Sequence, residues 1–130
     1  SMGPQVTFSS EFFNPVHGED EQTNPERFGK ALAEWLASCL KQRGVSVEGV
    51  LPEDFGWVVM IARKPVKLWF ACGNTDGSTT EWSVYSVAEV PLLQRLFKGI
   101  DPARELEELN THLVELVPQI PGISNVAWES

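Results

Sequence analysis

The sequence predicts an α+β fold, in which an antiparallel β-meander sheet carries its helices on one face. Three observations predict it. Four strand-like runs follow one another in the middle of the chain, helical periodicity precedes and follows them, and short strand-like runs stand near both ends. Strands in direct succession, with helices before and after, are typical of α+β proteins. The predicted order is β-α-β-β-β-β-α-α-β, in a single domain over residues 1–130.

The first elements are a strand and a long helix. Alternating apolar residues predict a strand within residues 5–13, and the polar, acidic stretch 14–24 predicts a solvated loop. Asn24-Pro25 predicts the helix start, because Asn caps free amides and Pro at the first helical position loses no hydrogen bond. Apolar residues then recur at helical spacing until Gly44, where the helix is expected to end.

The meander follows, with turn signals between its strands. The expected strands are 45–51, 57–63, 67–72 and 81–87, and the segment 52–56 is expected to be a turn. The run 57–63 is apolar on both sides, which is typical of a strand that is covered on both faces.

The last third predicts two helices and a strand. A short helix over 91–98 ends at Gly99, and Asp101-Pro102 repeats the cap-plus-proline start. Leucines spaced by three and four residues give the second helix one apolar stripe, and 123–128 reads as a final strand. The helices are expected to cover one face of the sheet.

Composition and charge limit the classes of partner. The chain has 18 acidic and 10 basic side chains, and its formal net charge is −8. Nucleic acids and anionic membranes attract basic surfaces, so neither is expected as a partner. The expected partner is another protein, and a basic one fits the charge. Ser1 stands before Met2 and is interpreted as the remnant of a cleaved expression tag.

The two cysteines, Cys39 and Cys72, lie in apolar runs and form no CxxC pair. This spacing predicts neither a disulfide framework nor a zinc site, and it favours a reduced, cytoplasmic protein. Both thiols are expected to be buried and slow to react. No signal peptide is recognised before Glu11, since that stretch has no basic residue and no apolar core.

Candidate chemistry is sparse. No phosphate-binding, dinucleotide-binding, zinc-protease or serine-hydrolase motif occurs. His17, followed by three acidic residues, has the ligand types of a metal site, but a solvated acidic loop is the preferred interpretation. Glu53 and Asp54 precede a tryptophan-rich strand and are the one candidate acid/base pair. The sequence assigns no catalytic, cofactor-binding or metal-binding residue, and no cofactor.

Aromatic residues carry the main functional hypothesis. Side chains alternate between the two faces of a strand. Trp69 is therefore expected on the other face from its apolar neighbours Phe70 and Cys72, and Tyr85 on the other face from Trp82. The few helices cover one sheet face, so the other face is closed either by loops and terminal strands or by a partner, a second copy included. The predicted partner-binding residues are Trp57, Trp69, Tyr85, Glu53 and Asp54.

In size, acidity and α+β order, the chain is similar to small acidic bacterial accessory proteins, namely immunity proteins that neutralise toxins and secretion chaperones. This resemblance implies a small non-enzymatic protein-binding module. Secretion chaperones of this size usually begin with a helix, whereas this sequence predicts an initial strand. Two alternatives stay open: a small ligand-binding domain or enzyme that uses Glu53 and Asp54 beside an aromatic wall, and a secretion-chaperone-like homodimer.

Overall fold

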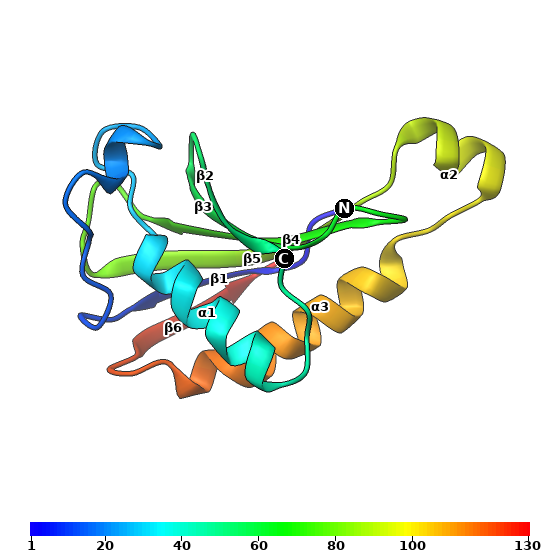
Figure 1. The fold of residues 1–130 in the computed structure, drawn as a ribbon. Helices are drawn as coiled ribbons and strands as arrows, with labels where there is room; N and C mark the ends of the chain where they lie inside the picture. Colours follow the sequence, from blue (N-terminus) through cyan, green and yellow to red (C-terminus); the bar gives the residue numbers. More distant parts are fainter.

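Six antiparallel strands form one open sheet in the order β2-β3-β4-β5-β1-β6 (Figure 1). The structure is a computed structural model and describes residues 1–130. The predicted α+β class and order of elements are confirmed. The strands are β1 (Gln5–Ser9), β2 (Gly49–Glu53), β3 (Gly56–Ala62), β4 (Lys67–Asn74), β5 (Glu81–Glu89) and β6 (Ser124–Glu129).

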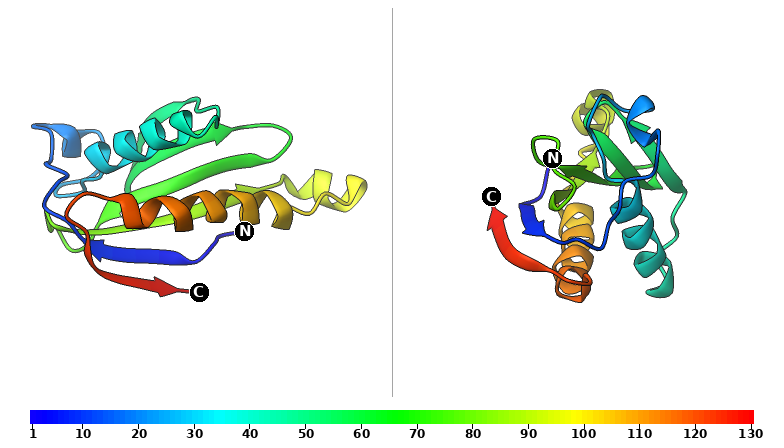
Figure 2. Two further views of the ribbon diagram at one scale, coloured as in Figure 1. Left: turned by 90° about the horizontal axis from the view of Figure 1, so that it is seen from below. Right: turned by 90° about the vertical axis from the view of Figure 1, so that its left-hand side faces the viewer.

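Three α-helices accompany the sheet, namely α1 (Lys30–Gln42), α2 (Leu92–Lys98) and α3 (Ala103–Leu116). Both α1 and α3 lie on the same face, α1 against β2 and β3 and α3 against β5 (Figure 2). Short 3₁₀ turns occur at Glu19–Glu21 and Val117–Gln119. None of the helices combines the length and the apolar character that crossing a bilayer requires.

The strand register separates two faces of the sheet. Trp57 pairs with Cys72, and Cys72 pairs with Val84, so these three side chains point the same way, toward the helices. The core between sheet and helices includes Val6, Phe8, Leu32, Leu36, Trp57, Val59, Phe70, Cys72, Trp82, Val84, Leu109 and Leu113. The side chains between these on each strand, such as Ala71 and its partner Tyr85, point to the opposite face.

The expected helix start at Asn24-Pro25 is wrong, because α1 begins at Lys30. No side chain of α1 itself caps the helix. The carboxylate of Glu19 instead accepts hydrogen bonds from the amides of Gly29 and Lys30, each at 3.1 Å. A remote acid thus caps the first amides of α1, which is the role that was expected of Asn24.

The segment before α1 follows the sheet rather than a helix. The Asn74 side chain, at the end of β4, accepts a hydrogen bond from the Phe28 amide and donates one to the Glu26 carbonyl. At Gly29 the backbone has φ +150°, and a Cβ there would lie 2.8 Å from the Cys72 carbonyl oxygen. Only glycine allows this close approach between loop and strand.

Two further expectations need correction. The predicted turn 52–56 is shorter, because β2 continues to Glu53 and β3 begins at Gly56. The helix α2 covers no sheet face: it has no buried residue and projects away from the body of the molecule (Figure 1).

The two cysteines differ in environment. Cys72 is fully buried on the helix side of β4, whereas Cys39 on α1 is half-buried, so the expectation of two buried thiols is correct for Cys72 only. Burial raises the pKa of both thiols above the ordinary value, and that of Cys72 far more.

A thiol reagent applied to the native protein should therefore label Cys39 first and leave Cys72 protected, because only the accessible thiolate reacts. The measurement is intact mass after timed labelling. The variant Cys39→Ser is the control, and it should stay unlabelled until the protein is unfolded. Rapid labelling of native Cys39→Ser would contradict the core position of Cys72.

Candidate functional site

The face of β3, β4 and β5 that is turned away from α1 and α3, here called the open face, carries two of the predicted aromatic residues. Trp69 and Tyr85 are half-buried on it. Trp57 is not on this face: it points toward the helices, is 2% exposed and belongs to the core. The sequence allowed either orientation, because the strand 57–63 is apolar on both sides. The structure therefore removes Trp57 from the candidate surface.

Phe55 completes an aromatic patch that we define as Phe55, Trp69 and Tyr85. The Phe55 ring lies 6.2 Å from the Trp69 ring, with an interplanar angle of 30°. Phe55 is at the tip of the β2–β3 hairpin, which curls over the open face (Figure 1). The sequence analysis did not include Phe55 because the segment 52–56 was interpreted as a turn.

Glycines hold the hairpin tip against the neighbouring strand. Gly56 has φ +151°, and a Cβ there would lie 2.5 Å from the Cys72 carbonyl oxygen. A Cβ on Gly73 would lie 3.2 Å from the Phe55 carbonyl oxygen. The Asn24 side chain also donates a hydrogen bond to the Asp54 carbonyl at 2.9 Å. Phe55 is thus held over the open face by close backbone packing against β4 and by the hydrogen bond from the Asn24 side chain.

Two small hollows flank Phe55. One has a volume of about 200 Å³ and is lined by Glu53, Phe55, Val58, Met60, Lys67 and Trp69. The other has a volume of about 170 Å³ and includes Arg27, Phe55, Ala71 and Tyr85 in its lining. Val58 and Met60 are buried at the bottom of the first hollow, so its floor is apolar. Each hollow has room for an apolar side chain of a partner.

The polar groups of the patch are few. The Trp69 Nε1 is shielded from solvent and has no hydrogen-bond partner within the chain. Burial raises the pKa of the Tyr85 hydroxyl above its ordinary value, so this group is neutral at physiological pH. Glu53 and Asp54 are exposed at the hairpin tip, beside the patch. The surface is therefore aromatic and carries both signs of charge, with Glu53 and Asp54 at the hairpin tip and with Lys67 and Arg27 in the lining of the two hollows.

The structure does not enclose Glu53 and Asp54 as an acid/base pair. Glu53 is the last residue of β2, Asp54 is in the turn, and both are exposed to solvent. The apolar wall beside them belongs to the open hollow described above. Neither histidine lines that hollow.

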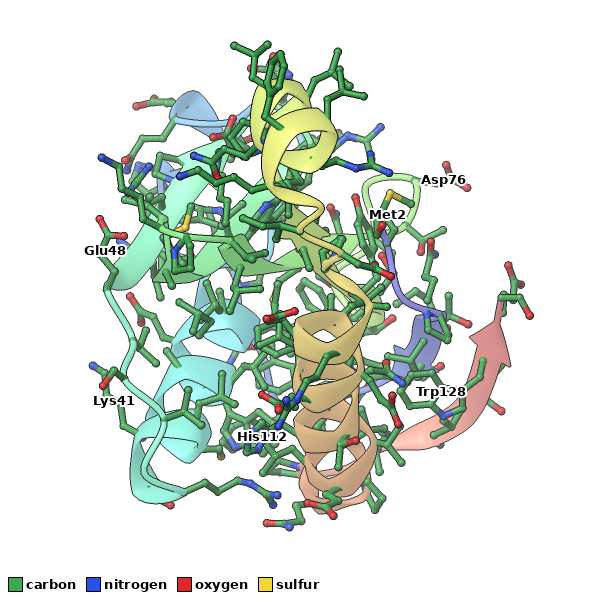
Figure 3. All side chains as sticks on the ribbon, turned by 90° about the vertical axis from the view of Figure 1, so that its right-hand side faces the viewer. Met2, Lys41, Glu48, Asp76, His112 and Trp128 are labelled. Carbon is green, nitrogen blue, oxygen red and sulfur yellow. The ribbon has the colours of Figure 1, made fainter.

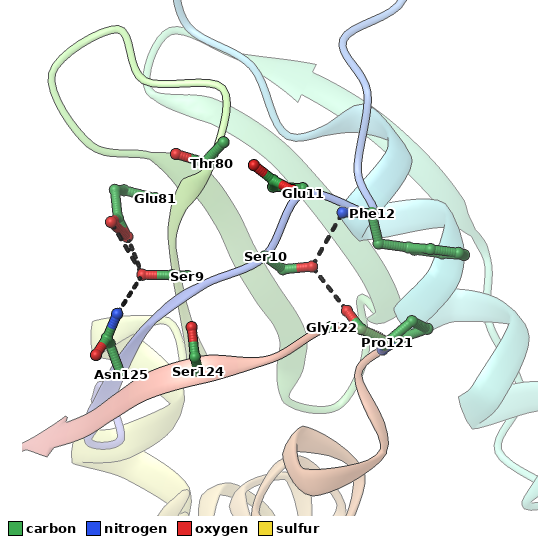
Figure 4. Close-up of a pocket in the computed structure, with 10 residues that line it drawn as sticks. All are labelled: Ser9, Ser10, Glu11, Phe12, Thr80, Glu81, Pro121, Gly122, Ser124 and Asn125. Carbon is green, nitrogen blue, oxygen red and sulfur yellow. Dashed lines mark hydrogen bonds between the residues drawn. The ribbon is translucent and has the colours of Figure 1, made fainter.

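A larger polar cavity lies where β1 ends, with a volume of about 590 Å³ (Figure 4). Its side chains are already paired with one another. The Ser9 hydroxyl binds the Glu81 carboxylate and accepts a hydrogen bond from Asn125, and the Ser10 hydroxyl donates to the Pro121 carbonyl. Neither histidine of the chain lines this cavity. These bonds join β1 to β5 and β6.

The acidic loop has a structural role that the sequence did not reveal. Glu19, within the expected solvated loop, is 1% exposed, and its carboxylate accepts three backbone amide hydrogen bonds, from Val16, Gly29 and Lys30. Nowhere in the chain do three metal-ligating side chains come together. His17 is exposed.

The second histidine, His112, is on α3 (Figure 3) and contacts the residue that follows α1. Its Nδ1 accepts a hydrogen bond from the Arg43 guanidinium at 3.0 Å, and Arg43 also pairs with Glu115. Arg43 directly follows α1, so this group ties the end of α1 to α3.

No family model, no curated protein and no solved structure matches the chain.

Proposed function

We propose that the chain is a small acidic, non-enzymatic protein-binding module, and that the aromatic patch is its working surface. One observation carries this proposal. Phe55, Trp69 and Tyr85 lie together, partly exposed, on the sheet face that no helix covers. Trp and Tyr anchor protein interfaces because each buries a large area with few rotatable bonds. A contiguous exposed aromatic surface of this kind is typical of a contact site.

Charge specifies the kind of protein that the patch favours. The chain has a net charge of −8, and Glu53 and Asp54 stand beside the patch. A basic partner surface is attracted by this field, which raises the association rate and makes binding weaken as salt rises. Nucleic acid and anionic membranes are repelled by the same field.

The biological setting that fits is that of an immunity-like or other accessory protein in a reducing compartment such as the cytoplasm. Size, acidity and α+β order support it, together with the two free cysteines. Proteins of this kind act by holding another protein, so a recognition surface suffices for them.

Ligand binding at the hollow beside Glu53 is the second candidate. The aromatic wall of Phe55 and Trp69 favours it, because flat rings stack on sugars and bases. The hollow of about 200 Å³ is smaller than the roughly 300–1,000 Å³ of small-molecule sites. Its size suits a single inserted side chain better, so protein binding is the preferred function.

The variant Trp69→Ala tests the proposal. Association with a partner should weaken by about 2 kcal/mol or more, because a central tryptophan of an interface contributes that much. The measurement is retention of partner proteins on the immobilised chain at low and at high salt, with bound proteins identified by mass spectrometry. Trp128→Ala on β6 is the matched control, since Trp128 is also partly exposed but lies away from the open face (Figure 3).

The expected result is a basic partner that the wild type and Trp128→Ala retain, that Trp69→Ala loses, and that high salt releases. Equal retention by Trp69→Ala and the wild type would remove the patch from the function. Unfolding of Trp69→Ala would show that Trp69 is a core residue, which would also contradict the proposal.

A further inference from the structure

The helix α2 is an apolar element without a covering surface. Leu92, Leu93 and Leu96 are each about two-thirds exposed, and Phe97 is 80% exposed. Isolated helices shorter than roughly 12–15 residues are marginal in water, so a helix of 7 residues depends on packing for its stability. Within its own chain α2 has no buried residue. Single exposed apolar residues are common, but four on one short helix indicate a contact.

The charge of α2 is opposite to that of the rest of the molecule. Between Glu89 and Asp101 the only charged residues are Arg95 and Lys98, both on α2 and both exposed. This segment therefore carries a charge of +2, within a chain whose net charge is −8. At the hairpin tip beside the aromatic patch, Glu53 and Asp54 carry the opposite charge, while Lys67 and Arg27 line the two hollows. The basic surface that the patch favours is thus present on the chain itself.

The positions of α2 and the patch fit an exchange between two copies. Both project to the same side of the sheet, away from α1 and α3 (Figures 1 and 2). The hairpin tip with Phe55 lies beside Gly73, near the end of β4, whereas α2 follows the end of β5, where Glu89 pairs with Lys67 at the start of β4. The hairpin tip, with Phe55 of the patch, and α2 therefore lie toward opposite ends of the open face.

A two-fold axis across the strands interchanges these ends. It brings α2 of each copy to the hairpin tip of the other, and both contacts form at once because the interface of a two-fold dimer is self-complementary. We propose that the chain forms a homodimer in which α2 of each copy seats on the aromatic patch of the other. In this contact the apolar side chains of α2, Leu96 and Phe97, lie against Phe55 and Trp69. Its basic side chains, Arg95 and Lys98, lie next to Glu53 and Asp54.

This inference rests on the proposed function, because it names the partner of the same patch. The measurement is the molar mass of the full chain in solution, by light scattering coupled to size-exclusion chromatography, over a wide concentration range. The wild type should be a dimer. Leu96→Asp should weaken the dimer about a hundredfold, because roughly tenfold is lost at each of two identical contacts. Val114→Asp is the matched control, since Val114 is an exposed apolar residue on α3, and it should remain dimeric.

A mixing experiment tests the reciprocal geometry. Trp69→Ala and Leu96→Asp homodimers each lack both complete contacts. A mixed dimer regains one, because the intact α2 of the Trp69→Ala copy meets the intact patch of the Leu96→Asp copy. The mixture should therefore associate more tightly than either variant alone. If the mixture stays as weak as its components, the exchange of α2 is contradicted.

Charge reversal avoids any effect on the core. Replacing Glu53 and Asp54 by lysine should weaken the dimer, and so should replacing Arg95 and Lys98 by glutamate. All four residues are exposed. Combining the four changes should restore the dimer, because opposite charges face one another again. Failure of the combined variant to recover would overturn the proposed contact.

The outcomes separate this inference from the proposed function. A wild type that is monomeric at every concentration overturns the homodimer, while the patch is still tested by the retention experiment with Trp69→Ala. A dimer that Val114→Asp disrupts, and that Leu96→Asp and Trp69→Ala leave intact, uses a different surface and overturns the inference as well.

Discussion

Trp82→Ala should lower the free energy of unfolding by about 3–5 kcal/mol, because Trp→Ala changes in a packed core cost that much. Trp82 is 1% exposed and lies in the core, where its ring meets that of Phe13 edge-on with centroids 6.0 Å apart. Its Nε1 also donates a buried hydrogen bond of 3.0 Å to the Ser10 carbonyl, which alanine leaves without this donor. Domains of this kind have total stabilities of roughly 5–15 kcal/mol, so the variant is expected to be partly unfolded at 37 °C.

Urea unfolding followed by circular dichroism measures this loss. Trp128→Ala is the matched control, because it removes the same side chain from a position that is 39% exposed on β6. Surface changes usually cost about 0.5 kcal/mol or less, so the control should stay close to the wild type. Equal losses in the two variants would contradict the placement of Trp82 in the core.

Glu19→Ala should cost about 3 kcal/mol, the second largest effect. The buried carboxylate accepts hydrogen bonds from three backbone amides, two of which begin α1. A hydrogen bond to a charged group contributes roughly 1.5–3 kcal/mol, and a buried donor left without a partner costs about 1–3 kcal/mol. The loop before α1 should loosen first, since Glu19 is its main link to the helix.

Hydrogen exchange of the Gly29 and Lys30 amides, together with urea unfolding, measures this effect. Glu21→Ala is the control, because Glu21 lies in the same turn but is exposed. Unchanged protection of the two amides in Glu19→Ala would show that the carboxylate does not cap the helix.

The sequence predicted the parts of the fold that local pattern determines. The Asp101-Pro102 signal placed the start of α3 correctly, because the Asp101 carboxylate accepts a hydrogen bond from the Ala103 amide and the cap is therefore local. The equivalent signal at Asn24-Pro25 failed, because Glu19 caps α1 and Asn74 holds the preceding segment against β4. Both contacts join residues that are far apart in the sequence, so a local pattern does not reveal them.

In the candidate site, too, local pattern predicted some residues and missed those that depend on distant contacts. Alternation placed Trp69 and Tyr85 on the open face because their strands are apolar on one side more than the other. It did not resolve Trp57, whose strand is apolar on both sides. Phe55 joined the patch only through the close approach of Gly56 to Cys72, which depends on the curvature of the hairpin.

The place of β1 in the sheet has a consequence for folding kinetics. Val6 pairs on one side with Val84 of β5 and on the other with Trp128 of β6. The first of the six strands to be synthesised therefore has partners that are synthesised late. Pairings over such long stretches of chain slow folding, toward the millisecond-to-second range of sheet-rich domains. Until β5 and β6 have been made, Val6 and Phe8 have no sheet to join, so their apolar side chains stay without their native cover.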